Sequence, residues 1–215
     1  MERVSRLIEM DGIKKKDLEI KLEKIPSHPN PQADLEQYST PSSIASALLF
    51  RAYANGHIKG KKIADLGSGT GIFSIGSAHL GAKSVQAIDI DEEVIQIAKK
   101  EAEEWSLLEI IDFKVEDVRE FETKVDTVIM NPPFGSQKRG ADLPFLKKAF
   151  EISEVVYTIH NAETRGFLEN FIKERGHNLF WEKRYMFEIA NMFEFHEKEK
   201  KSFEVISYGI DVKRD

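Results

Sequence analysis

Short apolar runs alternate with amphipathic stretches along most of the chain, and this alternation predicts its secondary structure. Buried strands are expected at Ile63–Leu66, Val85–Ile90, Ile110–Val115, Val125–Met130, Val155–His160, Leu179–Ile189 and Phe203–Val212. Helices are expected at Ile72–Leu80, Asp91–Trp105, Leu143–Phe150 and Thr164–Lys173. Strands that alternate with helices favour an α/β fold with a mostly parallel sheet. The last two strands are joined only by a loop, which predicts an antiparallel hairpin at one edge.

The segment before these elements follows a different pattern. A charged helix is expected up to about Lys24, followed by the proline-rich linker Ile25–Pro31, in which helix is disfavoured. Pro41 then stands at the first position of another helix, where proline is favoured. We therefore expect an N-terminal helical extension with its linker at residues 1–34 and a single domain at residues 35–215.

Composition excludes several classes of protein. The chain has 215 residues, no cysteine and a net charge of −6. Without cysteine it can form no disulfide framework, thiolate zinc site or cysteine nucleophile. The six histidines show no metal-ligand spacing, so no metal is expected. No apolar run reaches the ~18 residues that span a bilayer, and no signal-peptide core is visible. We therefore expect a cytoplasmic protein with no membrane partner.

A glycine-rich loop between the first strand and its helix is the first sign of a ligand site. Its residues are Asp65, Leu66, Gly67, Ser68, Gly69, Thr70 and Gly71. Glycine lets the backbone approach a ligand closely, and a helix N-terminus offers unpaired N–H groups. The G-x-G-x-G spacing differs from the G-x-G-x-x-G of dinucleotide binders, and the lysine of a P-loop is absent. The expected ligand is a nucleoside without an obligatory pyrophosphate.

Acidic residues follow the next two strands. Asp89 lies 22 positions after Gly67, at the end of a strand, where a carboxylate can accept both hydroxyls of a ribose. Asp117 follows the third strand and could accept from an adenine amino group, while the Val118 N–H donates to a ring nitrogen. A tight turn with solvated carboxylates is the structural alternative. Three successive strand ends with ligand-compatible residues favour the nucleoside site over it.

The sequence Asn131-Pro132-Pro133-Phe134 follows the fourth strand, where open α/β sheets place their ligands. Its two prolines remove N–H donors and leave carbonyls free to accept. The Asn131 side-chain oxygen and the Pro132 carbonyl can accept both hydrogens of a planar amino group. As the amine attacks a methyl group, these acceptors stabilise the positive charge that develops. Phe134 offers a face for a stacked base; the alternative is a proline turn with a core phenylalanine.

Together these motifs resemble the class I S-adenosylmethionine-dependent N-methyltransferases, and more narrowly the methyltransferase-like protein 5 family of ribosomal RNA adenine-N6 methyltransferases. The resemblance runs from about Leu35 to the C-terminus, and Leu35–Pro41 and Asp126–Gly135 carry it most selectively. It implies a Rossmann-like fold with helices on both faces of a seven-stranded sheet. Ser68 and Thr70 stand where eukaryotic members are expected to have cysteine, which indicates a prokaryotic or archaeal member.

The resemblance also implies a reaction and the residues that carry it. By position it assigns catalysis to Asn131, Pro132, Pro133 and Phe134. It assigns cofactor contacts to Gln37, Thr40, Asp65, Gly67, Ser68, Gly69, Thr70, Gly71, Ile72, Asp89, Ile90, Asp117, Val118 and Asn131. The implied reaction is direct methyl transfer from S-adenosylmethionine to a flipped adenine of small-subunit ribosomal RNA, leaving S-adenosylhomocysteine. The family also implies a small zinc-binding activator subunit that covers an exposed sheet edge.

The acidic net charge disfavours a nucleic-acid partner at first sight. However, residues 1–130 contain 17 basic and 23 acidic side chains, whereas residues 131–215 contain 14 of each. The neutral part carries basic doublets that could contact phosphates, although such doublets are usually solvated surface. The candidates for RNA contact are Lys138, Arg139, Lys183 and Arg184.

Other functions remain open at this stage. The same Asn-Pro-Pro-Phe pocket could hold a protein glutamine amide, as in release-factor glutamine-N5 methyltransferases. That class usually carries an N-terminal helical bundle, and the short segment before Leu35 weighs against it. A DNA methyltransferase is a third option, but no target-recognition domain is visible. The loop spacing and the complete Asn-Pro-Pro-Phe motif disfavour both a non-catalytic nucleoside-binding module and an NAD-dependent oxidoreductase.

Overall fold

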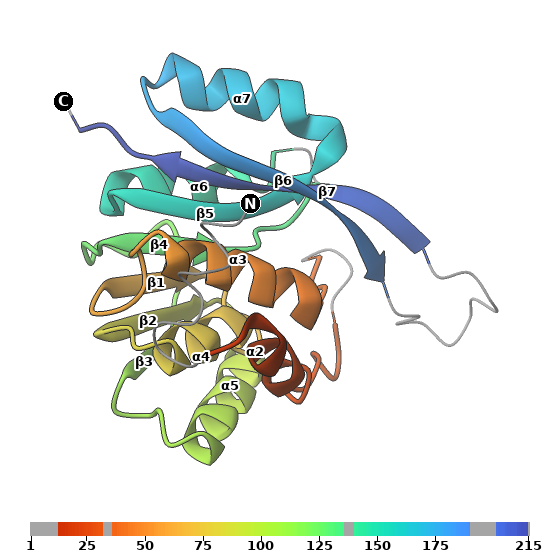
Figure 1. The fold of residues 1–215 in the computed structure, drawn as a ribbon, viewed down its shortest axis with the longest axis vertical. Coiled ribbons are helices and arrows are strands. Elements are labelled where there is room, and N and C mark those ends of the chain that lie inside the picture. Colours follow the sequence, from red (N-terminus) through yellow and green to blue (C-terminus); the bar gives the residue numbers. More distant parts are fainter. Residues whose placement is uncertain (1–12, 32–35, 136–139, 190–200, 215) are drawn as a thin grey trace.

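A seven-stranded mixed sheet forms the centre of the molecule (Figure 1). The structure is a computed structural model, and it describes residues 13–31, 36–135, 140–189 and 201–214. The strand order across the sheet is β3-β2-β1-β4-β5-β7-β6. The strands are β1 (Lys62–Leu66), β2 (Ser84–Asp89), β3 (Ile111–Val115), β4 (Thr127–Met130), β5 (Val155–Asn161), β6 (Asn178–Ile189) and β7 (Lys201–Asp211).

Strands β1 to β5 pair in parallel, whereas β7 pairs antiparallel with both β5 and β6. This pairing confirms the predicted α/β class, the mostly parallel sheet and the antiparallel hairpin at one edge. One detail goes beyond the prediction, because the last strand, β7, lies inside the sheet and β6 forms its edge. Figure 1 shows this long hairpin reaching beyond the parallel strands.

Helices cover both faces of the sheet, as expected. They are α2 (Lys15–Leu22), α3 (Ser42–Ala54), α4 (Ile72–His79), α5 (Glu92–Glu104), α6 (Leu143–Ile152), the 3₁₀ helix η2 (Ala162–Thr164) and α7 (Arg165–Glu174). Successive residues of a strand point to opposite faces. Accordingly, Ile63 of β1 joins the core with α3 and α4, whereas its neighbour Ala64 joins the core with α6 and α7.

The described part of the N-terminal extension packs directly on the domain. Leu18 and Leu22 of α2 are each 1 % exposed and share a core with Leu48 and Leu49 of α3. Helix α4 lies close to α3 because Gly76 has no side chain: a Cβ there would stand 2.4 Å from Cδ1 of Leu49. The extension therefore contributes to the main core, and the domain boundary at 34/35 stays a prediction.

The order of the strands determines where a ligand site can form. β1 has β2 on one side and β4 on the other. The chain therefore builds the sheet outward from β1 first in one direction, through β2 and β3, and then in the opposite direction, through β4 and β5. At such a switch point, loops that leave neighbouring strands diverge and open a crevice at their carboxyl ends. The glycine loop follows β1 and the Asn-Pro-Pro-Phe loop follows β4. The topology thus brings both loops to the same edge of the sheet.

Candidate functional site

A cavity of about 1170 Å³ lies at this edge of the sheet. Its wall includes the glycine loop, the ends of β2 and β4, part of the hairpin and much of the N-terminal segment. Sites for single drug-sized ligands usually measure about 300–1,000 Å³. The cavity is therefore large enough for two ligands side by side.

The glycine loop folds over the carboxyl end of β2. The N–H groups of Gly67 and Ser68 donate to the carbonyl of Ile88 at 2.8 and 2.9 Å. Gly67 and Gly69 have φ angles of 73° and 52°, in the left-handed region that favours glycine. A Cβ on Gly69 would meet no atom within 4 Å, so this stretch of backbone faces open space in the cavity wall.

Two predicted cofactor contacts of this loop lie outside the cavity wall. Gly71 precedes α4, and a Cβ there would stand 3.1 Å from Cβ of Ala98, so this glycine permits close packing of α4 on α5. Asp65 is fully buried beneath the loop and accepts a hydrogen bond of 2.6 Å from the Ser74 hydroxyl. Burial raises the pKa of Asp65 to about 7. In this structure both residues support the loop from behind, and a direct cofactor contact by either of them stays a prediction.

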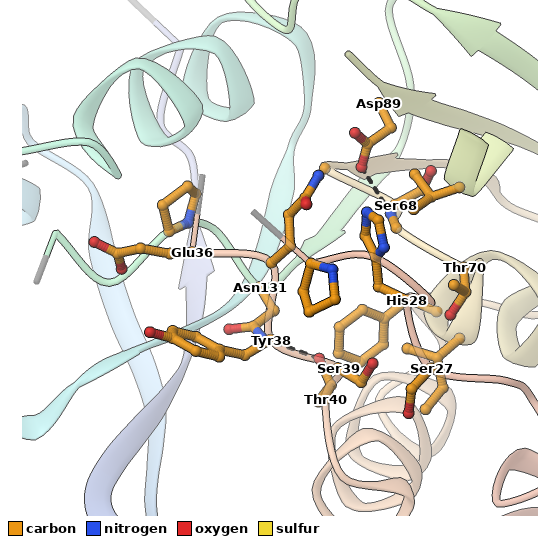
Figure 2. Close-up of a pocket in the computed structure, with 18 of the residues that line it drawn as sticks. Ser27, His28, Glu36, Tyr38, Ser39, Thr40, Ser68, Thr70, Asp89 and Asn131 are labelled. Atoms are coloured by element: carbon orange, nitrogen blue, oxygen red, sulfur yellow. Dashed lines mark hydrogen bonds between the residues drawn. The ribbon is translucent and has the colours of Figure 1, made fainter. Parts of the chain in front are cut away.

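Asp89 faces the cavity from the end of β2 (Figure 2). Its Oδ2 accepts from the Gly69 N–H at 2.8 Å, and its Oδ1 accepts from the Asp91 N–H at 3.0 Å. These backbone donors fix the carboxylate in place, although burial raises the pKa of Asp89 above its usual range. A carboxylate has about four acceptor positions, so it can still accept from ligand hydroxyls.

Asp117 has a partner that the sequence did not indicate. Its carboxylate accepts from the backbone N–H and from Nε of Arg119, each at 2.9 Å. These hydrogen bonds hold the pKa of Asp117 below its usual range. Asp117, Val118 and Arg119 all line the cavity, as does the exposed side chain of Ile90. No local pattern would have distinguished Arg119 from any other surface arginine.

Asn131 is held by a residue from the N-terminal segment (Figure 2). Its Nδ2 donates to the Thr40 hydroxyl at 3.0 Å. Its Oδ1 is buried and has no hydrogen-bond partner among the described residues. Both Asn131 and Pro133 line the cavity, and Pro132 between them is buried. An unsatisfied buried oxygen on a cavity wall is costly unless a ligand donor reaches it.

Phe134 packs in an apolar cluster and does not line the cavity in this structure, so its expected stacking role stays a prediction. It is 8 % exposed, and its ring makes edge contacts with Phe187 of β6 and Phe203 of β7 at centroid distances of 5.4 and 5.3 Å. Such edge-to-face contacts are favourable in an apolar cluster. The aromatic side chains on the cavity wall are instead those of Tyr38, Phe73, Phe145 and Phe187.

Residues 25–31, here called the strap, form a part of the cavity wall that sequence reasoning missed. His28 Nε2 lies 3.0 Å from Oδ2 of Asp91, and its Nδ1 accepts from the Asn30 N–H. The Asn30 amide donates to Glu93 at 3.1 Å. The strap is thus attached to the start of α5. Its prolines indicated an extended segment, but no pattern indicated which surface it crosses.

Asp91 joins the strap to the next segment of the wall. Besides His28, it accepts from Nε2 of Gln37 at 2.8 Å and from the Glu93 N–H, where it caps α5. Burial disfavours ionisation of Asp91, but the hydrogen bonds from Gln37, His28 and Glu93 outweigh burial and lower its pKa. Gln37 and Thr40, both predicted cofactor contacts, line the cavity together with Gly67, Ser68, Thr70 and Ile72.

The four predicted RNA contacts have different positions. Lys138 and Arg139 lie outside the described residues. Lys183 is exposed on β6, with its Nζ 5.0 Å from the ring centroid of Tyr185. Arg184, next in the strand, forms an ion pair of 2.9 Å with Glu204. Neither residue lines the cavity, although Met186 of the same strand does.

Neither a metal centre nor a membrane-spanning helix is found in the part of the chain that the structure describes. No group of three or more His, Asp or Glu side chains in the described ranges is arranged to hold a metal ion. None of the described helices is both long enough and apolar enough to cross a bilayer.

Comparison with known proteins identifies the family. The sequence model of the "Methyltransferase small domain" family matches residues 41–152. The rRNA N(6)-adenosine-methyltransferase METTL5 of Danio rerio is 31 % identical over 90 % of this chain and 96 % of its own. The chain belongs to the methyltransferase-like protein 5 family. It is therefore a methyltransferase.

Archaeal proteins resemble this family member along nearly its whole length. The uncharacterised protein MJ0284 of Methanocaldococcus jannaschii is 38 % identical over 93 % of this chain and 94 % of its own. The crystal structure of PH1948 from Pyrococcus horikoshii, proposed to be an RNA methyltransferase, superposes with a TM-score of 0.87. It is 44 % identical and covers 93 % of this chain and 98 % of its own. These findings confirm the predicted family and are consistent with an archaeal member.

Proposed function

We propose that this methyltransferase transfers a methyl group from S-adenosylmethionine to N6 of an adenosine in small-subunit ribosomal RNA. The observation that carries the proposal is the buried, unsatisfied Oδ1 of Asn131, which shares one cavity with Asp89. The first is an acceptor suited to an amino group, and the second is an acceptor suited to ribose hydroxyls. The cavity has room for a cofactor and a base together.

The cofactor side of the cavity fits S-adenosylmethionine, which when bound supplies an electrophilic methyl group. The open backbone at Gly69 leaves space for a closely bound nucleoside. Asp89 is positioned to accept from the ribose, and Ile90, Asp117 and Val118 surround the place for the adenine ring. The buried Oγ of Ser68 has no partner among the described residues, so it offers a further polar contact.

The substrate side provides acceptors rather than a base. We propose that Oδ1 of Asn131 and the carbonyl of Pro132 accept the two hydrogens of an adenine N6 amino group. The nitrogen lone pair then points away from both acceptors, and the positive charge on nitrogen is stabilised as the new N–C bond forms. The proton leaves after the attack, so no general base is required beforehand. The adenine must leave any stack to enter the cavity.

Substrate and partners follow from the same proposal. The relatives named as rRNA N(6)-adenosine-methyltransferases support ribosomal RNA as the substrate. We place the reaction in the cytoplasm as part of the same proposal. Exposed Lys183 lies on the strand that reaches the cavity through Met186 and is a candidate for phosphate contact. Strand β3 is a sheet edge with exposed Val115, and a small zinc-binding activator subunit would have a strand to pair with there.

Methyl labelling with disassembled ribosomal subunits tests the proposal. The wild-type chain, with or without a candidate activator, should label small-subunit RNA, and digestion should release labelled N6-methyladenosine. Asn131→Ala should lower transfer at least about 100-fold, because one of two preplaced acceptors is lost, with little change in cofactor affinity by calorimetry. Label on protein instead would favour the glutamine-N5 reaction, and undiminished transfer by Asn131→Ala would reject the assigned role.

A further inference from the structure

We propose that Thr40 is a positioning residue, which fixes the side-chain amide of Asn131 so that its oxygen faces the substrate amine. This inference rests on the proposed function and deepens it. Thr40 is 8 % exposed, and its hydroxyl accepts from Nδ2 of Asn131 at 3.0 Å. Figure 2 shows the two side chains meeting across the cavity wall from segments 91 positions apart in the sequence.

The backbone on the Thr40 side is restrained by sequence. Thr40 precedes Pro41, and a residue before proline is confined to extended conformations. The carbonyl of Pro41 accepts from the N–H groups of Ile44 and Ala45 at 2.9 Å, and so begins α3. Ile44 and Ala45 are buried in the core. The position of the Thr40 hydroxyl is therefore determined by the start of α3, which is anchored in the core.

The backbone on the Asn131 side is restrained in the same way. Asn131 leaves the fully buried strand β4 and precedes Pro132, so it too is confined to extended conformations. The remaining freedom is rotation of the side-chain amide about its last torsion, which is broad for asparagine. Thr40 limits this rotation through the hydrogen bond that it accepts from Nδ2. Because a hydroxyl can also donate, the contact holds the plane of the amide, and the donor hydrogens of the substrate amine select the orientation with Oδ1 toward the cavity.

The orientation of the amide determines which chemical group the cavity accepts. With Nδ2 bonded to Thr40, the free Oδ1 is an acceptor, and an incoming amino group can donate to it. With the amide turned over, Nδ2 would face the amine and set donor against donor. An acceptor in a fixed place is what stabilises an amine that becomes positively charged. Thr40 thus acts on the reaction through Asn131.

Thr40→Val tests this role, because valine keeps the shape of threonine and removes the oxygen. We expect single-turnover methyl transfer to ribosomal RNA at saturating S-adenosylmethionine to slow about 10-fold or more, with cofactor affinity changed less than about threefold. Thr40→Ser should recover most of the lost rate. Thr164→Val is the matched control, because Thr164 bonds the Asn161 carbonyl in η2, away from the cavity.

A second measurement needs no substrate. The side-chain amide resonances of Asn131, assigned by their loss in Asn131→Ala, should shift and exchange faster with water in Thr40→Val. In Thr40→Ser they should stay close to those of the wild type. Unchanged resonances in Thr40→Val would overturn the proposal. Weaker cofactor binding with full transfer at saturation would also overturn it, since Thr40 would then act only on the cofactor.

The two measurements separate this proposal from the proposed function. If the wild type labels no RNA but the Asn131 resonances respond to Thr40→Val, the assigned substrate is wrong and the positioning contact stands. If the wild type labels RNA and neither the rate nor the resonances respond, the substrate stands and the positioning role is rejected.

Discussion

Three aspartates near the ends of β1, β2 and β3 differ in how easily they ionise. Asp65 is fully buried, and burial raises its pKa to about 7. Burial also raises the pKa of Asp89, although donors from the backbone of Asp91 and Gly69 offset part of the effect. Asp117 has its pKa lowered by hydrogen bonds from Arg119. The carboxylates that face the cavity are thus held by donors, whereas Asp65 lacks most of this compensation.

Asp65 predicts a pH dependence of stability. Its pKa is about 7 in the folded chain and near 3.8 when unfolded, so the folded state holds the proton more tightly. Below about pH 4 Asp65 is protonated in both the folded and the unfolded chain, and it costs no stability. As the pH rises from about 4 to 7 only the unfolded chain releases this proton, so the free energy of unfolding of the wild type falls, and the loss is complete above pH 7. Asp65→Asn removes this titration and still accepts from Ser74. Its free energy of unfolding relative to wild type should rise by about 1–4 kcal/mol between pH 4 and pH 8.

Urea denaturation of both proteins at several pH values measures this difference. A constant difference between the two free energies of unfolding would show that Asp65 does not titrate in this range.

The strap completes one side of the cavity wall and is attached to the start of α5. Its hydrogen bonds converge on Asp91 and Glu93 at the start of α5, and Asp91 also holds Gln37. The cavity wall on this side thus depends on a helix cap. A cap that also binds two other segments couples the stability of α5 to the shape of the cavity.

Asp91→Ala tests this coupling. The variant removes the helix cap and the acceptor that His28 and Gln37 share, so the free energy of unfolding should fall by about 1–3 kcal/mol. Affinity for S-adenosylmethionine, measured by calorimetry, should fall as well. Glu93→Ala is the control, because it removes only an exposed contact to Asn30 and should change stability by less than about 0.5 kcal/mol. Equal effects of both variants would contradict the central role of Asp91.

The hairpin depends on one glycine. Gly209 lies in β7, between β5 and β6, and a Cβ there would stand 2.6 Å from the ring of Phe180. The backbone is paired on both sides and cannot move away, so Gly209→Ala should lower the free energy of unfolding by about 1–3 kcal/mol. Gly166→Ala in α7 meets no atom within 4 Å and should be neutral or slightly stabilising. Thermal unfolding of both variants, followed by circular dichroism, makes the comparison.

At the scale of the whole molecule, the sequence predicted what depends on local periodicity. Alternating strands and helices, the parallel sheet and the final hairpin all leave regular apolar patterns, so they could be predicted. Features formed by distant residues left no such trace. Phe134 packs on Phe187 and Phe203, and Asn131 bonds Thr40 across 91 positions. For the same reason no pattern indicated the path of the strap. The contact of Arg119 with Asp117 is local, but nothing in the sequence distinguishes this arginine from any other surface arginine.

The uneven charge of the chain predicts which part of it contacts RNA phosphates. Its excess of acidic residues lies within residues 1–130, so attraction to phosphates should come from cations of the later part. Lys183→Glu should weaken binding of small-subunit ribosomal RNA several-fold. The slope of log affinity against log salt concentration should become shallower by about one unit, because one phosphate contact is lost. Lys100→Glu, an exposed change of the same charge on α5, serves as the control. Filter binding at several salt concentrations measures both, and equal losses would indicate a nonspecific charge effect.

The cluster of Phe134, Phe187 and Phe203 has a consequence for synthesis of the chain. The glycine loop, Asp89 and Asp117 all leave the ribosome well before β6 and β7. A nascent chain that ends after β5 contains every predicted cofactor contact, but its Asn-Pro-Pro-Phe loop lacks both aromatic partners of Phe134. The part of the cavity proposed for the substrate is therefore completed last. If the proposed function is right, a chain truncated after β5 should bind S-adenosylmethionine but not the substrate base.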